Sequence, residues 1–479
     1  MRTASHCWKA MCRRGPTRPI AHGGVNVSNS QTRRRRMKKP AHWITLGGLA
    51  LLTLGFVTAC QKQENKQMKA PSKAEESIVD QKLELVFHSS SGDTEASFNT
   101  FYGDALRRKF PNWTITYIRS AAGRTLPELL VMNQKVDVLY SASNTFNEMA
   151  MPVELQYDMT GLIQKHSIDL RQYQSDLIEG LRTTNGEIYA LPITNIVQSL
   201  FYNKSIFDQF GVPYPIDGMT WESMLQTAQR LTRKEGEKQY LGFAASPSFL
   251  NMNPYGQSFW DTKSEMPTFQ EDVWKRLIQQ YFIVSAQGPG YKEWVIANNR
   301  LPYRLELTNS QQLAMFVFNS QFPLTVPEDM KKIDWDMIAL PTLAEKPGVG
   351  SQSTPYVMGV TSISENKDAA ITAIQYLMSL EMQTDYSRKG FMPVLDREDV
   401  RIPFAQDTVF KDKNWQSVFY NKPGPMAKSS RYELMAGRQL HAVVPRIVKG
   451  EVDLNTALRE AAENAQKAVA EVKSSVKVP

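Results

Sequence analysis

Cysteine is scarce in this chain of 479 residues, and the positions of the few cysteines restrict its chemistry. Of the three, Cys7 and Cys12 lie near the N-terminus and Cys60 follows an apolar run. A domain that begins after Cys60 therefore has no internal disulfide and no thiol nucleophile. Thiol catalysis and disulfide-stapled folds are excluded.

Motifs of catalysis and metal binding are also missing. Beyond Cys60 the histidines are His88, His166 and His441, which are far apart in the sequence. No H-E-x-x-H, C-x-x-C, G-x-S-x-G or Walker A pattern occurs. Adjacent acids such as Glu271-Asp272 are typical of a solvated face, although a glycosidase with two carboxylates aimed at one cleft stays open. We expect a protein that is not an enzyme and that holds no cofactor or metal.

Acidic residues are absent from residues 1–59, which carry eleven of the 56 lysines and arginines. Removing these eleven leaves 45 basic residues against 48 acidic ones, so the net charge of +8 belongs to the N-terminal segment. The rest of the chain has no basic excess that would bind phosphates. Nucleic acid is therefore not an expected partner.

Apolar runs long enough to span a bilayer are missing too. Ile44 to Val57 has fourteen residues, whereas a spanning helix needs about 20. The run follows the basic Met37-Lys38-Lys39 and precedes Val57-Thr58-Ala59-Cys60, an arrangement typical of a lipoprotein export signal. We predict a leader over residues 1–59 with lipidation at Cys60. For residues 1–36, a longer basic region and a true start at Met37 both stay open, and we favour the second.

Large apolar side chains are rare from residue 60 to residue 81, where Lys, Gln, Glu and Ser dominate. Such a segment has too little apolar surface to form a core. We predict a flexible tether over residues 60–81. With a lipid on Cys60, it would hold the following domain at the extracytoplasmic face of the cell membrane.

After the tether, strand-like and helix-like patterns alternate, which favours α/β units on a largely parallel sheet. Alternating apolar residues predict strands at Leu83–Phe87 and Val136–Tyr140. In such sheets ligands bind beyond the carboxyl ends of the strands. The loops after these two strands carry Ser90, Asp93 and Asn144, which are candidate ligand contacts, although such loops are also common as solvated turns.

Aromatic residues are frequent from Leu231 to Asn309, and most are expected in the core. Tyr255 and Trp260 differ because they lie among Asn, Pro, Gly and Ser in an irregular segment. Rings in loops over a rigid scaffold are candidates for ligand platforms. Asn319, directly after the apolar strand Ala314–Phe318, is a further polar candidate.

The stretch Glu187 to Trp221 contains a strand with Leu191-Pro192, a helix start at Tyr202-Asn203-Lys204 and a second helix start at Thr220-Trp221. Thr220 can cap a helix whose apolar positions recur three or four apart. This order resembles the extracellular solute-binding proteins of ABC importers, including the maltose-binding proteins. Trp335 to Pro341 and the turn Gly390 to Pro393 are similar to later parts of the same family.

The resemblance implies a type II periplasmic-binding-protein-like α/β fold with two lobes, between which the chain crosses about three times. Lobe one would be residues 82–194 plus 340–392, and lobe two would be 195–339 plus 393–479. The crossings would lie near Thr194-Asn195, Ala339 to Pro341 and Met392-Pro393. Thr194 and Asn195, the polar pair inside an apolar stretch, would then face the ligand.

The resemblance further implies the lipid-anchored substrate-binding subunit of an ABC importer. It would bind a mono- or oligosaccharide as a monomer, close about a hinge, and deliver the sugar to the membrane permease. In the maltose-binding branch a carboxylate follows the L-P strand, whereas this chain has Thr194-Asn195-Ile196. A saccharide other than maltodextrin is therefore expected. A lipid-anchored glycan-active enzyme and a sensor or adhesin without a permease are the alternatives.

Overall fold

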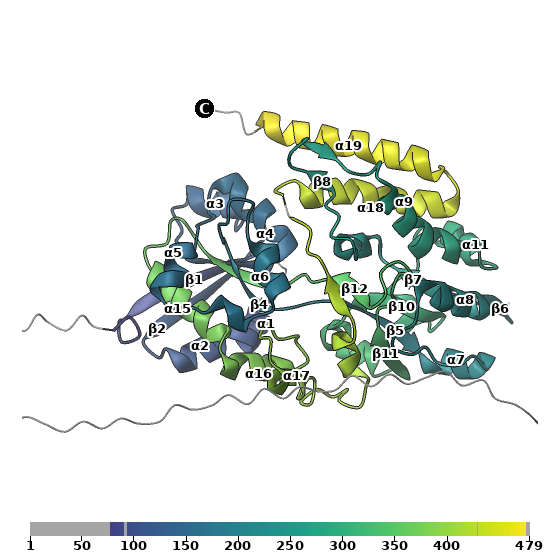
Figure 1. The fold of residues 1–479 in the computed structure, drawn as a ribbon, viewed down its shortest axis with the longest axis horizontal. Helices are drawn as coiled ribbons and strands as arrows, with labels where there is room; N and C mark the ends of the chain where they lie inside the picture. The colour runs from purple at the N-terminus through teal and green to yellow at the C-terminus, as the bar shows by residue number, and fades with distance from the viewer. Residues whose placement is uncertain (1–76, 91–92, 429, 476–479) are drawn as a thin grey trace, which may run out of the picture. The chain divides into compact units, whose positions relative to one another are not determined.

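The structure, a computed structural model, describes residues 77–90, 93–428 and 430–475. Contacts divide the chain into residues 1–72 and residues 73–479. The predicted leader, the lipidation site Cys60 and most of the tether lie outside the described residues. All that follows concerns the second unit, whose elements are labelled in Figure 1.

The first sheet holds the strands predicted near the N-terminus of this unit. Its order is β2-β1-β3-β13-β4, and β13 runs antiparallel to both of its neighbours while β1 is parallel to β2 and to β3. The strands are β1 (Leu83–Ser89), β2 (Trp113–Arg119), β3 (Val138–Ala142), β4 (Leu191–Thr194) and β13 (Tyr356–Val360). Residues 85–89 of β1 are all buried, so the strand is covered on both faces.

The helices of this first lobe pack on both faces of the sheet, as Figure 1 shows. They are α1 (Glu95–Phe98), α2 (Asp104–Lys109), α3 (Leu126–Val131), α4 (Ser143–Ala150), α5 (Thr160–Lys165), α6 (Ser175–Leu181), α15 (Lys367–Leu377), α16 (Leu380–Arg388) and α17 (Glu398–Arg401). Their apolar faces and the strands form one large buried cluster and a smaller one.

The second sheet has the order β11-β5-β10-β7-β6 and is mixed rather than largely parallel. β5 pairs antiparallel with β10 and β11, and the parallel pair is β10 with β7. The strands are β5 (Gln198–Asn203), β6 (Arg233–Glu235), β7 (Lys238–Ala245), β10 (Leu313–Asn319) and β11 (Trp335–Ala339). The parallel pairing expected from the alternation after the tether is found for β1, β2 and β3 of the first sheet, whereas β5, which follows the first crossing, pairs antiparallel with both neighbours.

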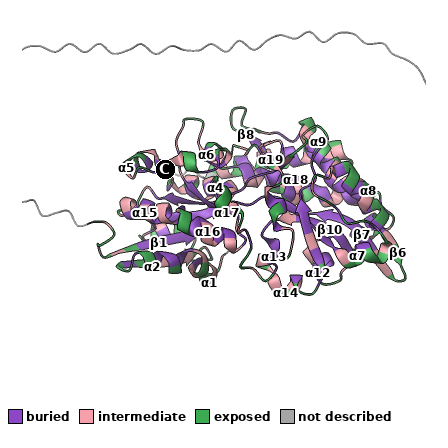
Figure 2. Cartoon of the chain, turned by 60° about the horizontal axis from the view of Figure 1, so that its bottom comes forward, coloured by how far each residue is buried: buried purple, intermediate pink, exposed green. Residues whose placement is uncertain are grey.

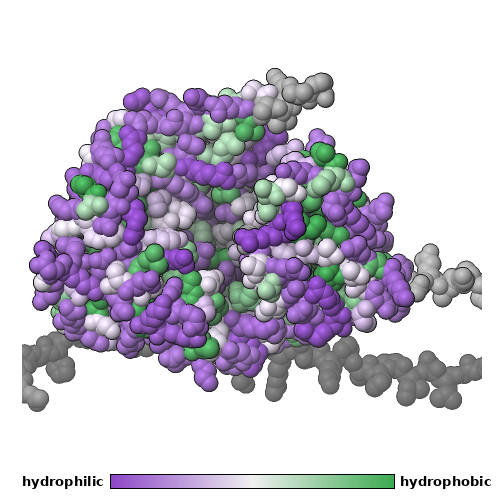
Figure 3. All heavy atoms as spheres, turned by 180° about the vertical axis from the view of Figure 1, so that it is seen from behind, coloured by the Kyte–Doolittle hydropathy of each residue, from purple (hydrophilic) through white to green (hydrophobic). Residues whose placement is uncertain are grey.

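The second lobe buries a large aromatic core beneath its helices, and Figure 2 shows its strands as mostly buried. Its helices are α7 (Lys204–Phe210), α8 (Trp221–Leu231), α9 (Asp272–Ile278), α10 (Val284–Ala286), α11 (Tyr291–Asn298), α12 (Arg304–Thr308), α13 (Phe322–Thr325), α14 (Pro327–Met330), α18 (Glu433–Lys449) and α19 (Leu454–Ser475). The short strands β8 (Trp260–Asp261) and β9 (Met266–Pro267) form a separate pair. In Figure 3 the visible outer surface is mainly hydrophilic.

Three crossings join the lobes, and some lie a few residues from the expected boundaries. The first, between β4 and β5, is fixed by the Asn195 N–H, which donates to the Met392 carbonyl at 2.8 Å. Leu340 and Leu343 still pack in the core of the second lobe. Val394, Leu395 and Val400 pack in the core of the first lobe, and Phe404 packs in the second. The third crossing thus follows α17, because Val400 of this helix packs in the core of the first lobe.

The middle crossing carries β12 (Val349–Gln352), which pairs in parallel with β14 (Lys422–Gly424). The segment from β14 to α18 touches both lobes. The Ala427 N–H donates to Gln352 Oε1 at 2.6 Å, and Lys428 Nζ donates to the carbonyls of Glu179 and Arg182 at 2.7 and 2.9 Å. We call residues 425–431 the strap, although Ser429 is outside the described residues.

Candidate functional site

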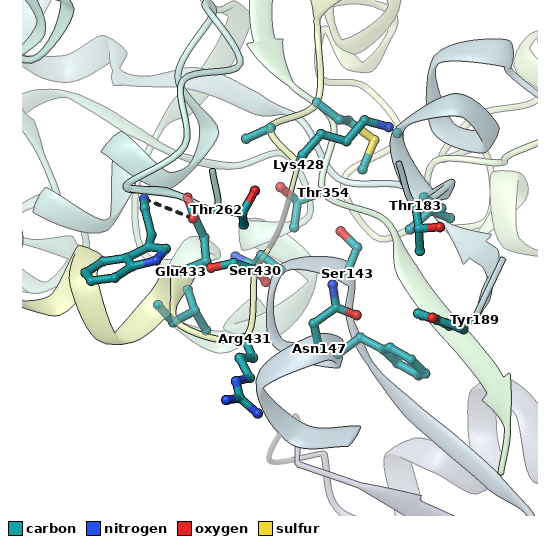
Figure 4. A pocket seen from close by; sticks show the side chains of 18 of the residues that line it. Ser143, Asn147, Thr183, Tyr189, Thr262, Thr354, Lys428, Ser430, Arg431 and Glu433 are labelled. Carbon is teal, nitrogen blue, oxygen red and sulfur yellow. Dashed lines mark hydrogen bonds between the residues drawn. The ribbon is translucent and has the colours of Figure 1, made fainter. Parts of the chain in front are cut away.

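A cavity of about 370 Å³ lies between side chains of the two lobes and the strap. Figure 4 shows Ser143, Asn147 and Tyr189 of the first lobe on one side, facing Thr262 and Glu433 of the second. Its aromatic rings come from both lobes: Phe146, Tyr189, Phe259, Trp260 and Tyr432. We call this space the aromatic chamber.

A second cavity of about 200 Å³ lies at the carboxyl ends of β3, β7 and β10 and the start of β5. Its polar lining is dominated by amides and hydroxyls: Asn144, Gln198, Ser246, Ser248, Asn251, Asn319 and Thr354. We call it the amide chamber. Asn144, Asn251 and Thr354 line both chambers, so the two cavities are neighbours, and we call them together the cleft. Strand ends of an α/β sheet are the usual place for a ligand.

Two buried amide oxygens in the amide chamber lack a hydrogen bond from any described residue, Gln198 Oε1 and Asn251 Oδ1. Gln198 is only 7% exposed, and its backbone N–H donates to Ser351 Oγ at 2.9 Å, which fixes the start of β5. A buried acceptor without a donor costs roughly 1–3 kcal/mol. Both side chains therefore keep an unused acceptor beside the cavity that they line.

The wall of the aromatic chamber is held by Glu433, the first residue of α18. Its Oε1 accepts the Phe259 N–H at 2.6 Å and its Oε2 accepts the Trp260 N–H at 3.3 Å. Burial raises the pKa of Glu433 to about 7, and the two N–H donors act in the opposite direction. The ring of Trp260 meets that of Tyr432 edge to face, with centroids 5.6 Å apart.

Polar contacts also join the two lobes around this cleft. Arg438 of α18 pairs with Glu148 of α4, with Nη2 and Oε1 3.1 Å apart. The Lys428 ammonium lies on carbonyls at the C-terminal end of α6, where the helix dipole favours a cation. The pair and the strap lysine connect elements on either side of the aromatic chamber.

Three of the residues proposed from sequence lie on the cleft. Asn144 lines both chambers, Asn319 lines the amide chamber and Trp260 lines the aromatic chamber. Whether they touch a ligand stays a prediction.

The other five proposed residues do not line either chamber. Thr194 and Asn195 are buried, and Asn195 Nδ2 donates to Ser353 Oγ at 3.0 Å, so its amide serves the crossing. Tyr255 donates its hydroxyl to Glu345 Oε1 at 2.5 Å and packs against Lys346. Ser90 is exposed, and the Asp93 carbonyl accepts the Tyr117 hydroxyl at 3.0 Å.

The sequence argument missed Gln198, Asn251 and Glu433. A glutamine at the start of an apolar strand, directly after the crossing, was a signal for Gln198. Asn251 follows the polar segment after β7. Glu433 had no local signal, because its partners are more than 170 residues away in the sequence.

Within the described ranges, no group of three or more His, Cys, Asp or Glu side chains is placed to hold a metal ion. In the same part of the chain, no helix combines the length and apolarity that crossing a membrane requires.

Solved structures of sugar-binding proteins share this fold at low sequence identity. A sugar transporter protein of Rhizobium etli in an open conformation has 20% identity and a TM-score of 0.62, covering 80% of this chain and 99% of its own. An ABC substrate-binding protein of Listeria monocytogenes in complex with cycloalternan has 16% identity and a TM-score of 0.62, covering 81% and 100%. The sugar-binding protein MalE of Xanthomonas citri has 16% identity and a TM-score of 0.60, covering 83% and 100%.

No curated protein sequence matches the chain. These structural neighbours are binding proteins, and they establish the two-lobed type II periplasmic-binding fold. A sequence profile described as bacterial extracellular solute-binding protein matches residues 91–384. The chain belongs to the bacterial extracellular solute-binding protein family.

Proposed function

We propose that this chain captures a saccharide in its cleft and delivers it to an ABC permease. The observation that carries the proposal is the pair of amide side chains, Gln198 and Asn251, that line the amide chamber and whose buried oxygens have no donor among the described residues. Sugar hydroxyls supply such donors. Aromatic rings line the adjoining chamber, and Tyr189 is the one among them that is only partly buried. A ring of this kind can pack against the C–H face of a sugar.

Relatives of the same fold support a saccharide ligand. Among the similar structures are one with bound mannotriose and one from Thermotoga lettingae with bound α-D-tagatose. Because the two chambers share three lining residues and are chemically different, we infer that an oligosaccharide lies across both. One end would hydrogen-bond in the amide chamber while another unit stacks in the aromatic chamber. Asn144, Asn319 and Trp260 are the contacts proposed from sequence that this placement retains.

Delivery would use rotation of the lobes about the three crossings. Ligand that contacts both lobes favours the arrangement in which both are within reach. Asn195 contributes to this hinge through Met392 and Ser353 rather than through the ligand. The closed monomer would then dock on the permease at the extracytoplasmic face of the membrane, held there by a lipid on Cys60. A Cys60→Ser chain that stayed in the membrane fraction would contradict the anchor.

The test is a thermal-shift and calorimetric screen of residues 61–479, which include the whole described unit, against mannotriose, cycloalternan, tagatose and other mono- and oligosaccharides. A ligand at 100 times its dissociation constant should stabilise the protein by about 2.7 kcal/mol. Gln198→Leu should weaken binding roughly tenfold or more by removing the buried acceptor. Gln229→Leu, on the exposed side of α8, is the matched control and should bind normally.

No shift with any sugar would overturn the saccharide claim and leave the fold untouched. Turnover of a glycan by the purified protein would support an enzyme instead. Binding without a permease partner in pull-down experiments would favour a sensor or adhesin.

A further inference from the structure

Glu433 connects α18 to a loop of the aromatic chamber that is far away in sequence. The carboxylate is 6% exposed and lines the chamber itself. Both of its oxygens are engaged by consecutive backbone N–H groups, those of Phe259 and Trp260. Two such bonds fix the backbone of Phe259 and Trp260 relative to α18, so the position of the Trp260 ring depends on Glu433.

Several charged groups around Glu433 form ion pairs or hydrogen bonds with other residues. On α18, Arg438 pairs with Glu148 of α4, and Arg431, just before the helix, donates to the Tyr432 hydroxyl. On α19, Lys473 pairs with Glu265 of the chamber rim. Arg182, which also lines the chamber, pairs with Glu179. Other nearby groups that carry or can gain charge are Lys428 of the strap, Asp261 beside Trp260, and His441 of α18.

None of these groups forms an ion pair or hydrogen bond with Glu433 in the part of the chain that the structure describes. Asp261 accepts the Lys263 N–H and the Ser264 hydroxyl. His441 meets the Phe259 ring edge to face at 5.7 Å, and burial lowers its pKa to about 4, so it is neutral at neutral pH. The N–H groups of Phe259 and Trp260 therefore stabilise the Glu433 charge without a cation.

We propose that Glu433 is a positioning residue for the Trp260 wall, and that its ionisation links saccharide binding in this cleft to pH. The ionised carboxylate accepts both N–H bonds as charge-assisted bonds, which are about twice as strong as neutral ones. The protonated acid is a weaker acceptor and gains an O–H that needs its own partner. Burial of the charge outweighs these bonds, since the pKa of Glu433 is raised rather than lowered, so the positioned wall is favoured when Glu433 is protonated and loosens when it ionises.

The direction of the pH effect follows from that difference. Because burial raises the pKa of Glu433 to about 7, the change falls within the neutral range rather than in acid. A group whose pKa is raised in the positioned wall stabilises that wall when it is protonated, so affinity should decrease as pH rises through this range. This step rests on the proposed saccharide function, whereas the positioning of the loop does not.

The first measurement uses the ligand-free protein, residues 61–479, and asks only about positioning. Hydrogen–deuterium exchange of the Phe259 and Trp260 amides, corrected for intrinsic exchange, should show protection that decreases from about pH 5.5 to about pH 8.5, because opening of the loop hydrates the Glu433 carboxylate and favours its ionised form. In Glu433→Gln the protection should be independent of pH, because the amide does not titrate. Protection that is the same in both proteins at every pH would overturn the proposal.

The second measurement is the dissociation constant for mannotriose, or for whichever sugar the screen identifies, over the same pH range. Wild-type affinity should fall roughly tenfold as pH rises, and Glu433→Gln, which stays neutral, should remain near the acid value. Glu306→Gln is the matched control. Glu306 is buried and accepts the Tyr303 N–H, but Arg300 holds its pKa low, so it does not titrate here.

The two measurements separate the possible failures. Loss of sugar binding in every protein together with pH-dependent amide protection would reject the saccharide and keep Glu433 as a positioning group. Sugar binding with the same pH profile in wild type and Glu433→Gln would keep the function and reject the role of Glu433. A change in the profile of Glu306→Gln would show that any buried carboxylate has the effect, which also contradicts the proposal.

Discussion

Glu433 and His441 lie on the same helix and both contact Phe259, yet burial moves their pKa values in opposite directions. The pKa of Glu433 rises from 4.5 to about 7, and that of His441 falls from 6.5 to about 4. The folded-state pKa of Glu433 is raised, so its contribution to stability is full below about pH 4.5 and is lost as pH rises through about 7. The contribution of His441 is full above about pH 6.5 and is lost as pH falls through about 4.

In the wild-type protein these two slopes oppose each other between about pH 4.5 and about pH 6.5. Glu433→Gln removes the slope that Glu433 causes. The free energy of unfolding of this variant should therefore increase relative to that of the wild type as pH rises from about 4 to about 8. The relative gain is on the order of 2–3 kcal/mol. Urea unfolding at a series of pH values measures it. Curves for the two proteins that stay parallel would show that Glu433 has an ordinary pKa.

At the scale of elements, α8 shows what a sequence can predict. Thr220 accepts the Ser223 N–H at 3.3 Å, and the apolar positions Trp221, Met224, Leu225, Ala228 and Leu231 are all buried. The N-cap and the helical spacing involve only residues close together in the sequence, so both can be predicted from it. The site depends on contacts between residues far apart in the sequence. Asn144 and Asn319 could be predicted because each follows a strand, where ligands bind. Glu433 could not, because only the folded core brings it to the Phe259 loop.

The packing of α8 on β7 gives a prediction of its own. A Cβ at Gly242 would overlap the Ala228 carbonyl of the helix backbone. Backbone cannot move aside cheaply, so Gly242→Ala should lower the free energy of unfolding by roughly 1–3 kcal/mol. Gly161→Ala is the matched control, since a Cβ there meets nothing within 4 Å. In helix α5 it should stabilise by about 0.5–1 kcal/mol. Denaturant unfolding of both variants shows whether the loss comes from overlap with the Ala228 carbonyl or from adding a methyl group at any glycine.

At the scale of the whole unit, the question is what holds the lobes in this arrangement without ligand. Arg438 and Glu148 are 63% and 23% exposed as side chains, so their pair contributes only about 0–1 kcal/mol to folding. Lys428 adds two hydrogen bonds from the strap to the end of α6. An equilibrium between two lobe arrangements changes tenfold for about 1.4 kcal/mol. Contacts too weak to affect folding can therefore control that equilibrium.

The double variant Lys428→Ala, Arg438→Ala should accordingly unfold at nearly the wild-type denaturant concentration while its lobes separate more often. Small-angle scattering of the ligand-free protein should give a larger radius of gyration, and saturating sugar should reverse the increase. Arg459→Ala is the control. It removes an exposed ion pair with Glu463 that has a similar N–O distance, 3.0 Å, but lies within α19 and joins no lobes. It should leave the scattering unchanged. An unchanged radius in the double variant would mean that the crossings, with Asn195 between Met392 and Ser353, set the lobe arrangement without help from the surface contacts.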